Sequence, residues 1–182
     1  MKLVILDRDG VINQDSDTYI KSPEEWLPLD GSLEAIARLG KAGFKIVVAT
    51  NQSGIARKLF DEFTLARIHQ KMISLAESHG GLIDAVFYCP HGPDEGCNCR
   101  KPKTGMLEEI AAEFGVDLAG VPFVGDSLKD LQAAERVGCI PYLVRTGKGK
   151  QTLTNLKGSD FSEVVQVADL DEASRLIIQQ CR

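Results

Sequence analysis

Short apolar segments alternate with amphipathic ones along most of the chain. Each apolar segment is a continuous run, which is typical of strands covered on both faces, as in parallel sheets. The segments between them carry apolar residues at helical spacing. The predicted strands are Lys2 to Leu6, Lys45 to Ala49, Ala85 to Cys89, Val121 to Gly125 and Ile140 to Val144, and the predicted helices are Ser32 to Ala42, Asp61 to His79, Gly105 to Phe114, Lys129 to Val137 and Asp169 to Gln180.

This order of elements predicts a fold of the α/β class. Strands that alternate with helices form a doubly wound, three-layer sandwich around a mainly parallel central sheet. A chain of 182 residues has the usual size of one domain, so we expect a single domain over residues 1–182. No segment is long enough for a cap domain. The ligand site of such a sandwich lies beyond the carboxyl ends of the strands, at a switch in strand order.

Three segments do not fit the alternation. Asn13 to Leu29 and Pro90 to Thr104 follow predicted strands, and we expect both to be loops that form the site. Arg145 to Gly158 is rich in glycine and lysine, but it lacks the Gly-x4-Gly-Lys-Ser/Thr spacing of a phosphate-binding loop. We therefore expect a solvated loop there.

Charge and hydropathy limit the possible partners. The net charge of -5 and a pI near 5.3 argue against a general nucleic-acid surface, because phosphate backbones are bound mainly by clusters of lysine and arginine. No apolar run is long enough to cross a bilayer, and the first residues lack a signal-peptide core. We expect a cytoplasmic protein with no membrane partner, and nothing in the pattern requires more than a monomer.

Carboxylates follow two of the predicted strands. Asp7 and Asp9 leave the first strand on the same side, where two like charges repel unless a cation or a shared proton intervenes. Asp126 follows the fourth strand, so these three residues are able to share one magnesium ion. A solvated acidic turn is the alternative for an isolated Asp-x-Asp. We expect Asp130 to be a first-turn helix residue, favoured by the helix dipole.

Groups suited to phosphate follow the second strand and precede the third helix. Thr50, Asn51, Gln52 and Ser53 offer hydroxyl and amide groups beside a predicted helix start, whose backbone N–H groups bind anions. The alternative is a plain helix cap formed by Ser53. Further along, Arg100 and Lys101 supply positive charge for a dianionic substrate, and Lys101 is the predicted contact of the phosphoryl group. A solvated basic face is the alternative for that pair.

A dense group of soft ligands predicts a metal site. The chain has five cysteines, and three of them stand close to a histidine at the end of the third predicted strand and in the loop that follows it: Cys89, His91, Cys97 and Cys99. This donor set matches tetrahedral zinc, and a site filled by four protein ligands is structural, because a catalytic zinc keeps one position open. A loop that merely contains these residues is the alternative.

The remaining cysteines and histidines have simpler predicted roles. We expect Cys139 to be a small buried residue and Cys181 to be a thiol of the tail. His69 and His79, on a predicted helix, are expected to be packing or surface residues.

The acidic and polar motifs together resemble those of the haloacid dehalogenase (HAD) superfamily of phosphatases. Its motifs correspond here to Asp7 with Asp9, Thr50, Lys101, and Gly125 with Asp126. The resemblance implies that Asp7 attacks phosphorus and Asp9 acts first as acid and then as base. It also implies that Thr50 and Lys101 hold the phosphoryl oxygens and that Asp126 completes the magnesium site. As an acid, Asp9 requires a raised pKa.

Longer segments resemble one branch, the D-glycero-D-manno-heptose 1,7-bisphosphate 7-phosphatases. These segments are LDRDGVIN, VVATNQSGIAR, CPHGPDEGCNCRKP and VGDS. The resemblance implies a magnesium-dependent phosphomonoesterase that removes the 7-phosphate of this sugar during synthesis of ADP-heptose, a precursor of the lipopolysaccharide core. It also implies that the loop from Asp15 to Lys21 and the zinc loop enclose the sugar. The expected substrate contacts are Asp15, Tyr19, Asn51, Gln52, Ser53, Arg100 and Ser127, the last replacing a lysine found in many members.

Other functions remain open at this point. Histidinol-phosphate phosphatases of the same branch have similar motifs and zinc. A phospho-acceptor signalling domain also carries an aspartyl-phosphate, although such domains place the acceptor after a middle strand, whereas Asp7 follows the first. A zinc-stabilised interaction module without activity is a third possibility.

Overall fold

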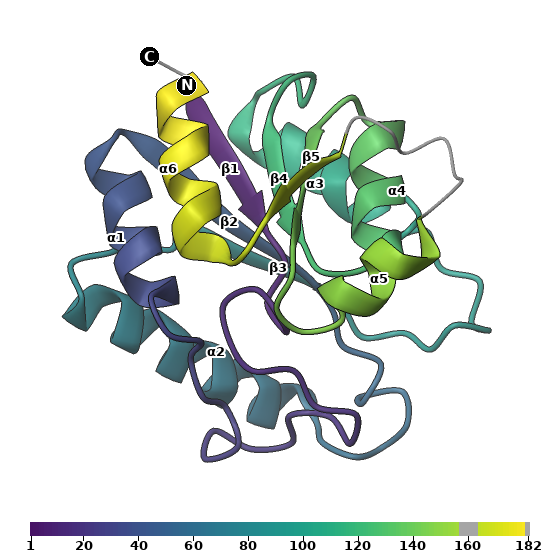
Figure 1. Cartoon of the computed structure of the whole chain (residues 1–182). Coiled ribbons are helices and arrows are strands. Elements are labelled where there is room, and N and C mark those ends of the chain that lie inside the picture. The colour runs from purple at the N-terminus through teal and green to yellow at the C-terminus, as the bar shows by residue number, and fades with distance from the viewer. Residues whose placement is uncertain (157–163, 181–182) are drawn as a thin grey trace.

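The computed structural model describes residues 1–156 and 164–180, which form a six-stranded parallel sheet between two layers of helices (Figure 1). The strand order is β3-β2-β1-β4-β5-β6. The strands are β1 (Lys2–Leu6), β2 (Phe44–Asn51), β3 (Ala85–Cys89), β4 (Pro122–Gly125), β5 (Ile140–Val144) and β6 (Val165–Val167). The helices are α1 (Ser32–Lys41), α2 (Glu62–Ser78), α3 (Gly105–Phe114), α4 (Leu128–Arg136), α5 (Gly149–Asn155) and α6 (Leu170–Gln180).

Both faces of the central strands are buried, as their continuous apolar runs predict. On β1, Val4 and Leu6 pack into a core with α1, α2 and α6, whereas Leu3 and Ile5 pack into a second core with α3 and α4. Figure 1 shows these helix layers on opposite sides of the sheet. The predicted α/β sandwich is therefore confirmed.

The path of the chain brings the ends of β1 and β4 together. From β1 the chain moves outward through β2 to β3, and then returns to place β4 on the other side of β1. Leu6 pairs with Val124, and the backbone N–H of Asp7 donates to the carbonyl oxygen of Val124 at 2.9 Å. The switch in strand order thus lies between β1 and β4, where Asp7 and Asp126 emerge.

The five predicted strands and five predicted helices are all present, with bounds that differ only slightly from the prediction. Two elements were missed, because their sequences lack the expected apolar patterns. Strand β6 has three residues with a polar one in the middle, and it pairs with β5. Helix α5 is largely polar, and its buried residues are Gly149 and Thr152.

The prediction of a solvated loop over Arg145 to Gly158 is wrong for the part that forms α5. The Thr152 hydroxyl donates to the carbonyl oxygen of Asp126 at 2.8 Å, which holds this helix against the end of β4. Positions 157 and 158 lie outside the described residues.

The loop between β1 and α1 is irregular, as predicted, and it is anchored to the core. Trp26 is fully buried, and Lys71 of α2 donates to the carbonyl oxygens of Pro23 and Trp26 at 2.7 and 2.8 Å. The hydroxyl of Ser32, at the start of α1, donates to the carbonyl oxygen of Ile12 at 2.7 Å. These contacts fix the loop over the carboxyl end of the sheet.

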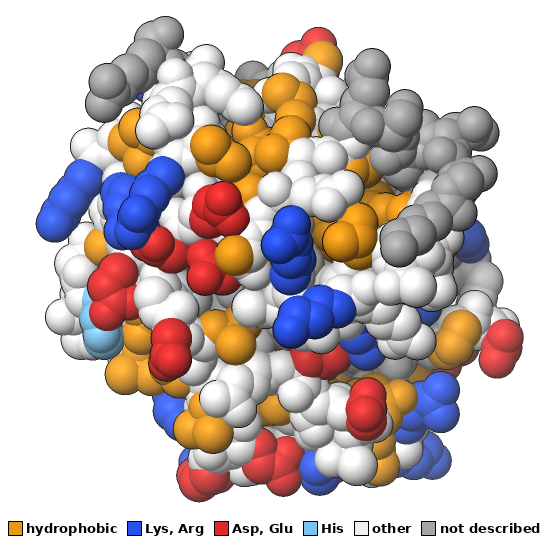
Figure 2. All heavy atoms as spheres, in the orientation of Figure 1, with side chains coloured by type: hydrophobic (Ala, Val, Ile, Leu, Met, Phe, Trp, Pro, Cys, Tyr) orange, Lys and Arg blue, Asp and Glu red, His pale blue; other side chains and the backbone are white. Residues whose placement is uncertain are grey.

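Two features of the described residues bear on possible partners. Within residues 1–156 and 164–180, no helix has both the length and the apolar composition needed to cross a bilayer. Figure 2 shows one face, on which lysine and arginine side chains are scattered among acidic and uncharged ones. The described part of that face therefore offers no broad basic patch.

Replacing Trp26 with alanine should destabilise the protein strongly. Because Trp26 is fully buried, the change leaves a cavity, and we expect the free energy of unfolding to fall by about 3–5 kcal/mol in urea denaturation. The neighbouring Leu27 is 49% exposed, so Leu27→Ala should change it by less than about 1 kcal/mol. Equal small effects of both changes would contradict the anchoring role of Trp26.

Candidate active site and metal sites

Three carboxylates and one lysine form the floor of the candidate active site. Asp7 follows β1, Asp126 follows β4, and Asp130 lies in the first turn of α4. Carboxylate oxygens of these three residues lie within 4.8 Å of one another. The ammonium nitrogen of the buried Lys101 forms ion pairs with Asp7 Oδ1 at 3.0 Å and Asp130 Oδ1 at 2.6 Å, and it donates a hydrogen bond to the carbonyl oxygen of Ala49 at 2.7 Å. The lysine is therefore surrounded by protein oxygens.

The floor contains more negative than positive charge. Burial and the neighbouring Asp130 raise the pKa of Asp7, although Lys101 opposes the shift. Burial, together with Asp130 and Asp7, also raises the pKa of Asp126. Burial lowers the pKa of Lys101, but its two carboxylate partners outweigh that effect and raise it. One lysine therefore does not balance this group, and an oxygen-binding divalent cation fits the donor set.

The position of Asp130 was predicted, but its role in the site was missed. It is an acidic residue of the first turn of α4, and its Oδ2 accepts from the backbone N–H and the hydroxyl of Ser127 at 3.0 and 2.6 Å. The same side chain reaches Lys101 through its other oxygen. Gly125 makes this possible, because a Cβ at that position would lie 2.3 Å from the Cβ of Asp130.

Asp9 does not belong to the carboxylate cluster of the floor. Its oxygens accept from Arg8, from Asn13 Nδ2 at 2.9 Å and from Gln52 Nε2 at 2.9 Å. Burial raises the pKa of Asp9, but Arg8 and the two amide donors outweigh it, so that the pKa is lowered. The expectation of a raised pKa is thus wrong for this structure, because the sequence does not reveal that these donors converge on one carboxylate.

The residues after β2 form a turn and not the start of a helix. Helix α2 begins only at Glu62 and is capped by the side chain of Asp61, so the alternative of a helix cap at Ser53 is wrong. Gln52 Nε2 also donates to Thr50 Oγ1 at 2.9 Å. Asn51 pairs with the backbone of Lys101, since its Nδ2 donates to the carbonyl oxygen and its Oδ1 accepts from the N–H, both at 3.0 Å.

A cleft of about 550 Å³ lies above the floor, which is in the size range of small-molecule sites. It is lined by most of the residues predicted from sequence to act in catalysis or substrate binding, namely Asp7, Asp9, Asp15, Tyr19, Thr50, Asn51, Gln52, Ser53, Arg100, Asp126 and Ser127. Two basic residues that were not predicted, Lys129 and Lys148, also line it.

Lys148 connects the rim of the cleft with its floor. Its backbone N–H donates to Asp126 Oδ2 at 2.7 Å, and its Nζ lies 3.4 Å from Asp15 Oδ2. The assignment of its segment to a solvated loop concealed this lysine. Across the rim, the guanidinium of Arg57 lies 5.9 Å from the ring centroid of Tyr19, and Arg100 Nη1 donates to the carbonyl oxygen of His91 at 3.2 Å.

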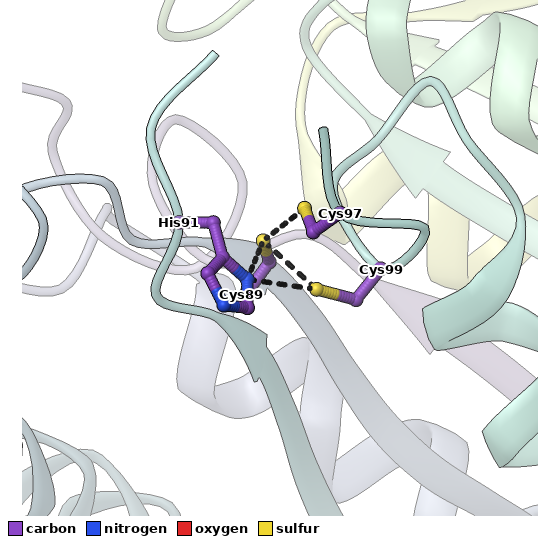
Figure 3. A group of neighbouring side chains, drawn as sticks. All are labelled: Cys89, His91, Cys97 and Cys99. Atoms are coloured by element: carbon purple, nitrogen blue, oxygen red, sulfur yellow. Dashed lines mark hydrogen bonds between the residues drawn. The ribbon is translucent and has the colours of Figure 1, made fainter. Parts of the chain in front are cut away.

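The four predicted zinc ligands lie together, as Figure 3 shows. Cys89 ends β3, and the other three belong to the loop before α3. The sulfur of Cys89 lies 3.1 Å from that of Cys99 and 3.7 Å from that of Cys97, and His91 Nδ1 lies 3.3 Å from the sulfur of Cys99. Ligands at ~2.0–2.3 Å from a tetrahedral zinc are separated by roughly 3.3–3.8 Å. The donor set fits this metal once the sulfurs of Cys89 and Cys99 move slightly apart.

The three thiols of the cluster have different pKa values, and burial raises those of Cys89 and Cys99. Burial raises the pKa of Cys97, but the backbone N–H of Arg100 and the neighbouring thiols outweigh it and lower that pKa. A lowered thiol pKa favours the thiolate, which is the form that binds metal. Two residues after Cys99 the chain reaches Lys101, so the cluster lies beside the floor of the active site.

Among the described residues, the remaining cysteine and histidines lie outside the active-site floor and the zinc cluster. Cys139 is buried, as expected, and His69 is a buried packing residue that also contacts Arg8. His79 lies at the end of α2, where its Nδ1 is 2.9 Å from the carbonyl oxygen of Leu75. Cys181 lies outside the described residues.

Comparison with known proteins shows the family to which this chain belongs. A family model described as HAD-hydrolase-like matches residues 98–173. A D-glycero-β-D-manno-heptose-1,7-bisphosphate 7-phosphatase of Bordetella bronchiseptica is 63% identical over 153 residues, which are 84% of this chain and 86% of that protein. The protein of the same name from Neisseria meningitidis serogroup A is 50% identical over 99% of this chain and 96% of its own length.

Solved structures agree with these sequence matches. The crystal structure of the D,D-heptose 1,7-bisphosphate phosphatase of B. bronchiseptica, complexed with magnesium and phosphate, has a TM-score of 0.95 and 56% identity and covers 99% of both chains. The corresponding enzyme of Burkholderia thailandensis has a TM-score of 0.77 and 46% identity, with coverage of 98% and 99%. Identity at this level along nearly the full length of both chains means that this protein belongs to the D-glycero-D-manno-heptose 1,7-bisphosphate 7-phosphatase family of HAD-like hydrolases.

Proposed function

We propose that this protein is a magnesium-dependent phosphomonoesterase that hydrolyses the 7-phosphate of D-glycero-D-manno-heptose 1,7-bisphosphate through an aspartyl-phosphate on Asp7. The convergence of Asp7, Asp126 and Lys101 beneath the cleft carries the proposal. It is also supported by the shared name of the relatives and by the magnesium and phosphate complex of the B. bronchiseptica enzyme. In this role the protein acts in the synthesis of the ADP-heptose precursor of lipopolysaccharide.

In the first step, an oxygen of Asp7 attacks phosphorus and the bond to the sugar oxygen breaks. Asp9 gives a proton to that leaving oxygen. The phosphate dianion of the substrate raises the pKa of Asp9 when it binds, because a second negative charge disfavours the carboxylate. Lys101 offsets the charge of Asp7 and so lowers the repulsion between the nucleophile and the substrate. Thr50 and Ser53 contribute hydroxyl groups to the phosphoryl oxygens.

In the second step, Asp9 takes a proton from water, the water oxygen attacks the phosphorus of the aspartyl-phosphate, and phosphate leaves while Asp7 is regenerated. We assign the magnesium ion to Asp7 and Asp126, with Asp130 as a further oxygen donor within reach. Asp9, the third ligand predicted from sequence, does not belong to this cluster, and its carboxylate accepts hydrogen bonds from Arg8, Asn13 and Gln52. A bound magnesium ion supplies positive charge for the oxygens of the transferring phosphoryl group.

The rim of the cleft favours a substrate with a second phosphate. Arg100, Lys129 and Lys148 line the cleft, and Lys129 has a lowered pKa because burial and the neighbouring Arg100 and Lys148 disfavour its charge. A second dianion relieves this repulsion among cations, whereas histidinol phosphate carries only one phosphate and a cationic amine. Asp15, Tyr19 and Ser127 are then placed to contact the sugar.

We further propose a structural zinc ion on Cys89, His91, Cys97 and Cys99, a monomeric state and a cytoplasmic location. The distances among the four side chains support the zinc assignment. The location follows from the substrate, which is an intermediate of biosynthesis.

Asp7→Asn should abolish turnover without loss of folding. The amide keeps the shape of the carboxylate but is not a nucleophile, so we expect phosphate release from the heptose bisphosphate to fall by at least ~10³-fold with little change in Tm. Asp30→Asn, at an exposed position, is the matched control and should retain full activity. Residual activity near that of the wild type would reject Asp7 as the nucleophile. A wild-type protein that stays phosphorylated without multiple turnovers would instead indicate a signalling domain.

The heptose bisphosphate should be a better substrate than histidinol phosphate. We expect kcat/KM to be higher by at least ~10²-fold, because the three cations at the rim meet a second phosphate only in the bisphosphate. Steady-state phosphate release with both compounds measures the ratio. A preference for histidinol phosphate by orders of magnitude would replace the proposed substrate.

Cys97→Ser should remove zinc and lower stability. Because structural zinc contributes to the free energy of folding, we expect a loss of about 3 kcal/mol or more and a Tm lower by roughly 10 °C. Metal analysis and thermal unfolding provide the measurements, and Cys139→Ala, a change outside the cluster, should leave the zinc content unchanged. A wild-type protein that is fully active and free of zinc would refute the assignment.

A further inference from the structure

Arg8 lies between the two carboxylates of the first motif, and the mechanism above gives it no role. Its side chain is fully buried although it is permanently charged. Its Nη2 lies 3.0 Å from both carboxylate oxygens of Asp9, and its Nε lies 3.2 Å from Oδ1. Burying a guanidinium costs free energy unless its N–H groups have hydrogen-bond acceptors. The third nitrogen, Nη1, therefore also needs an acceptor.

That acceptor is His69 on α2. Arg8 Nη1 lies 3.2 Å from His69 Nε2. A guanidinium only donates hydrogen bonds, so Nε2 is the acceptor and the neutral ring carries its proton on Nδ1. Burial and the adjacent Arg8 lower the pKa of His69 to about 3, which keeps the ring neutral at physiological pH. The ring of Tyr88 on β3 packs near it, with centroids 6.0 Å apart and planes at 59°.

We propose that Arg8 and His69 are positioning residues for Asp9, which acts as the acid and base. His69, on α2, holds the guanidinium of Arg8, and this guanidinium in turn holds the carboxylate of Asp9. The inference rests on the proposed function, because it requires Asp9 to donate a proton to the leaving oxygen. Among the described residues, the other hydrogen bonds of the guanidinium are to Asp9, its neighbour in sequence. His69 is therefore the residue that ties the guanidinium to α2, whereas Asn13 and Gln52 contact the carboxylate directly.

The nature of the leaving group separates this role from a merely structural one. A sugar oxygen leaves as a strongly basic alkoxide unless it is protonated, whereas p-nitrophenolate leaves readily without a proton. The ratio kcat/KM reports only the steps up to departure of the leaving group, so the later role of Asp9 as a base does not enter. Misplacement of Asp9 should therefore affect a sugar phosphate much more than p-nitrophenyl phosphate.

The test uses His69→Leu, which places an apolar side chain beside Tyr88 and removes the hydrogen-bond acceptor for Arg8. We expect kcat/KM for the heptose bisphosphate to fall by ~10- to 100-fold, and kcat/KM for p-nitrophenyl phosphate to change by less than about threefold. His69→Gln places an amide oxygen near the position of Nε2 and should restore most of the loss. His79→Leu, on the same helix but away from the site, is the matched control and should change neither value.

Equal losses with both substrates, or no loss with either, would overturn the proposal. If the leucine variant does not fold, the same two kcat/KM values are measured for His69→Met, because the flexible, apolar methionine side chain adapts to its surroundings. A wild-type protein that cleaves other sugar phosphates but not the heptose bisphosphate would reject the proposed substrate alone. The comparison of leaving groups then proceeds with the sugar phosphate that it does cleave.

Discussion

The organisation of this site depends on the repulsion among carboxylates crowded at the point where β1 and β4 end. Asp7, Asp126 and Asp130 lie too close together to be charged without compensation, and Lys101 supplies only part of it. The unbalanced charge gives the site its affinity for a cation. The same negative charge stabilises the buried ammonium group of Lys101, which lies within ion-pair distance of two of these carboxylates.

Asp9 is held in a different way, although it stands only two residues from Asp7. Its carboxylate lies outside the carboxylate cluster of the floor and accepts from Arg8, Asn13 and Gln52. One short motif thus places two chemically identical side chains in opposite environments. Burial and the neighbouring Asp130 raise the pKa of Asp7, whereas Arg8 and the amide donors around Asp9 outweigh its burial and lower its pKa.

The sequence was sufficient for β1 to β5, most of the helices and most of the residues that converge in the cleft, because buried parallel strands give continuous apolar runs and active-site residues follow their carboxyl ends. It failed where burial has no periodic signature. The polar helix α5 was one such case, and its misassignment concealed Lys148. The contacts of Asp130 with Lys101 and of Arg8 with His69 also left no signal, since each joins elements far apart in the chain.

The attachment of Lys101 limits how the zinc loop can vary in length. Asn51 binds the lysine backbone from one side, and Cys97 and Cys99 hold the preceding residues from the other. If a residue were inserted between Cys99 and Lys101, the cysteine cluster and Asn51 could not both hold the chain in its present position. The exposed tip at residues 93–96 is under no such restraint, because both of its ends are held at the cysteine cluster. We therefore expect natural insertions and deletions in this loop to occur at the tip and not between Cys99 and Lys101.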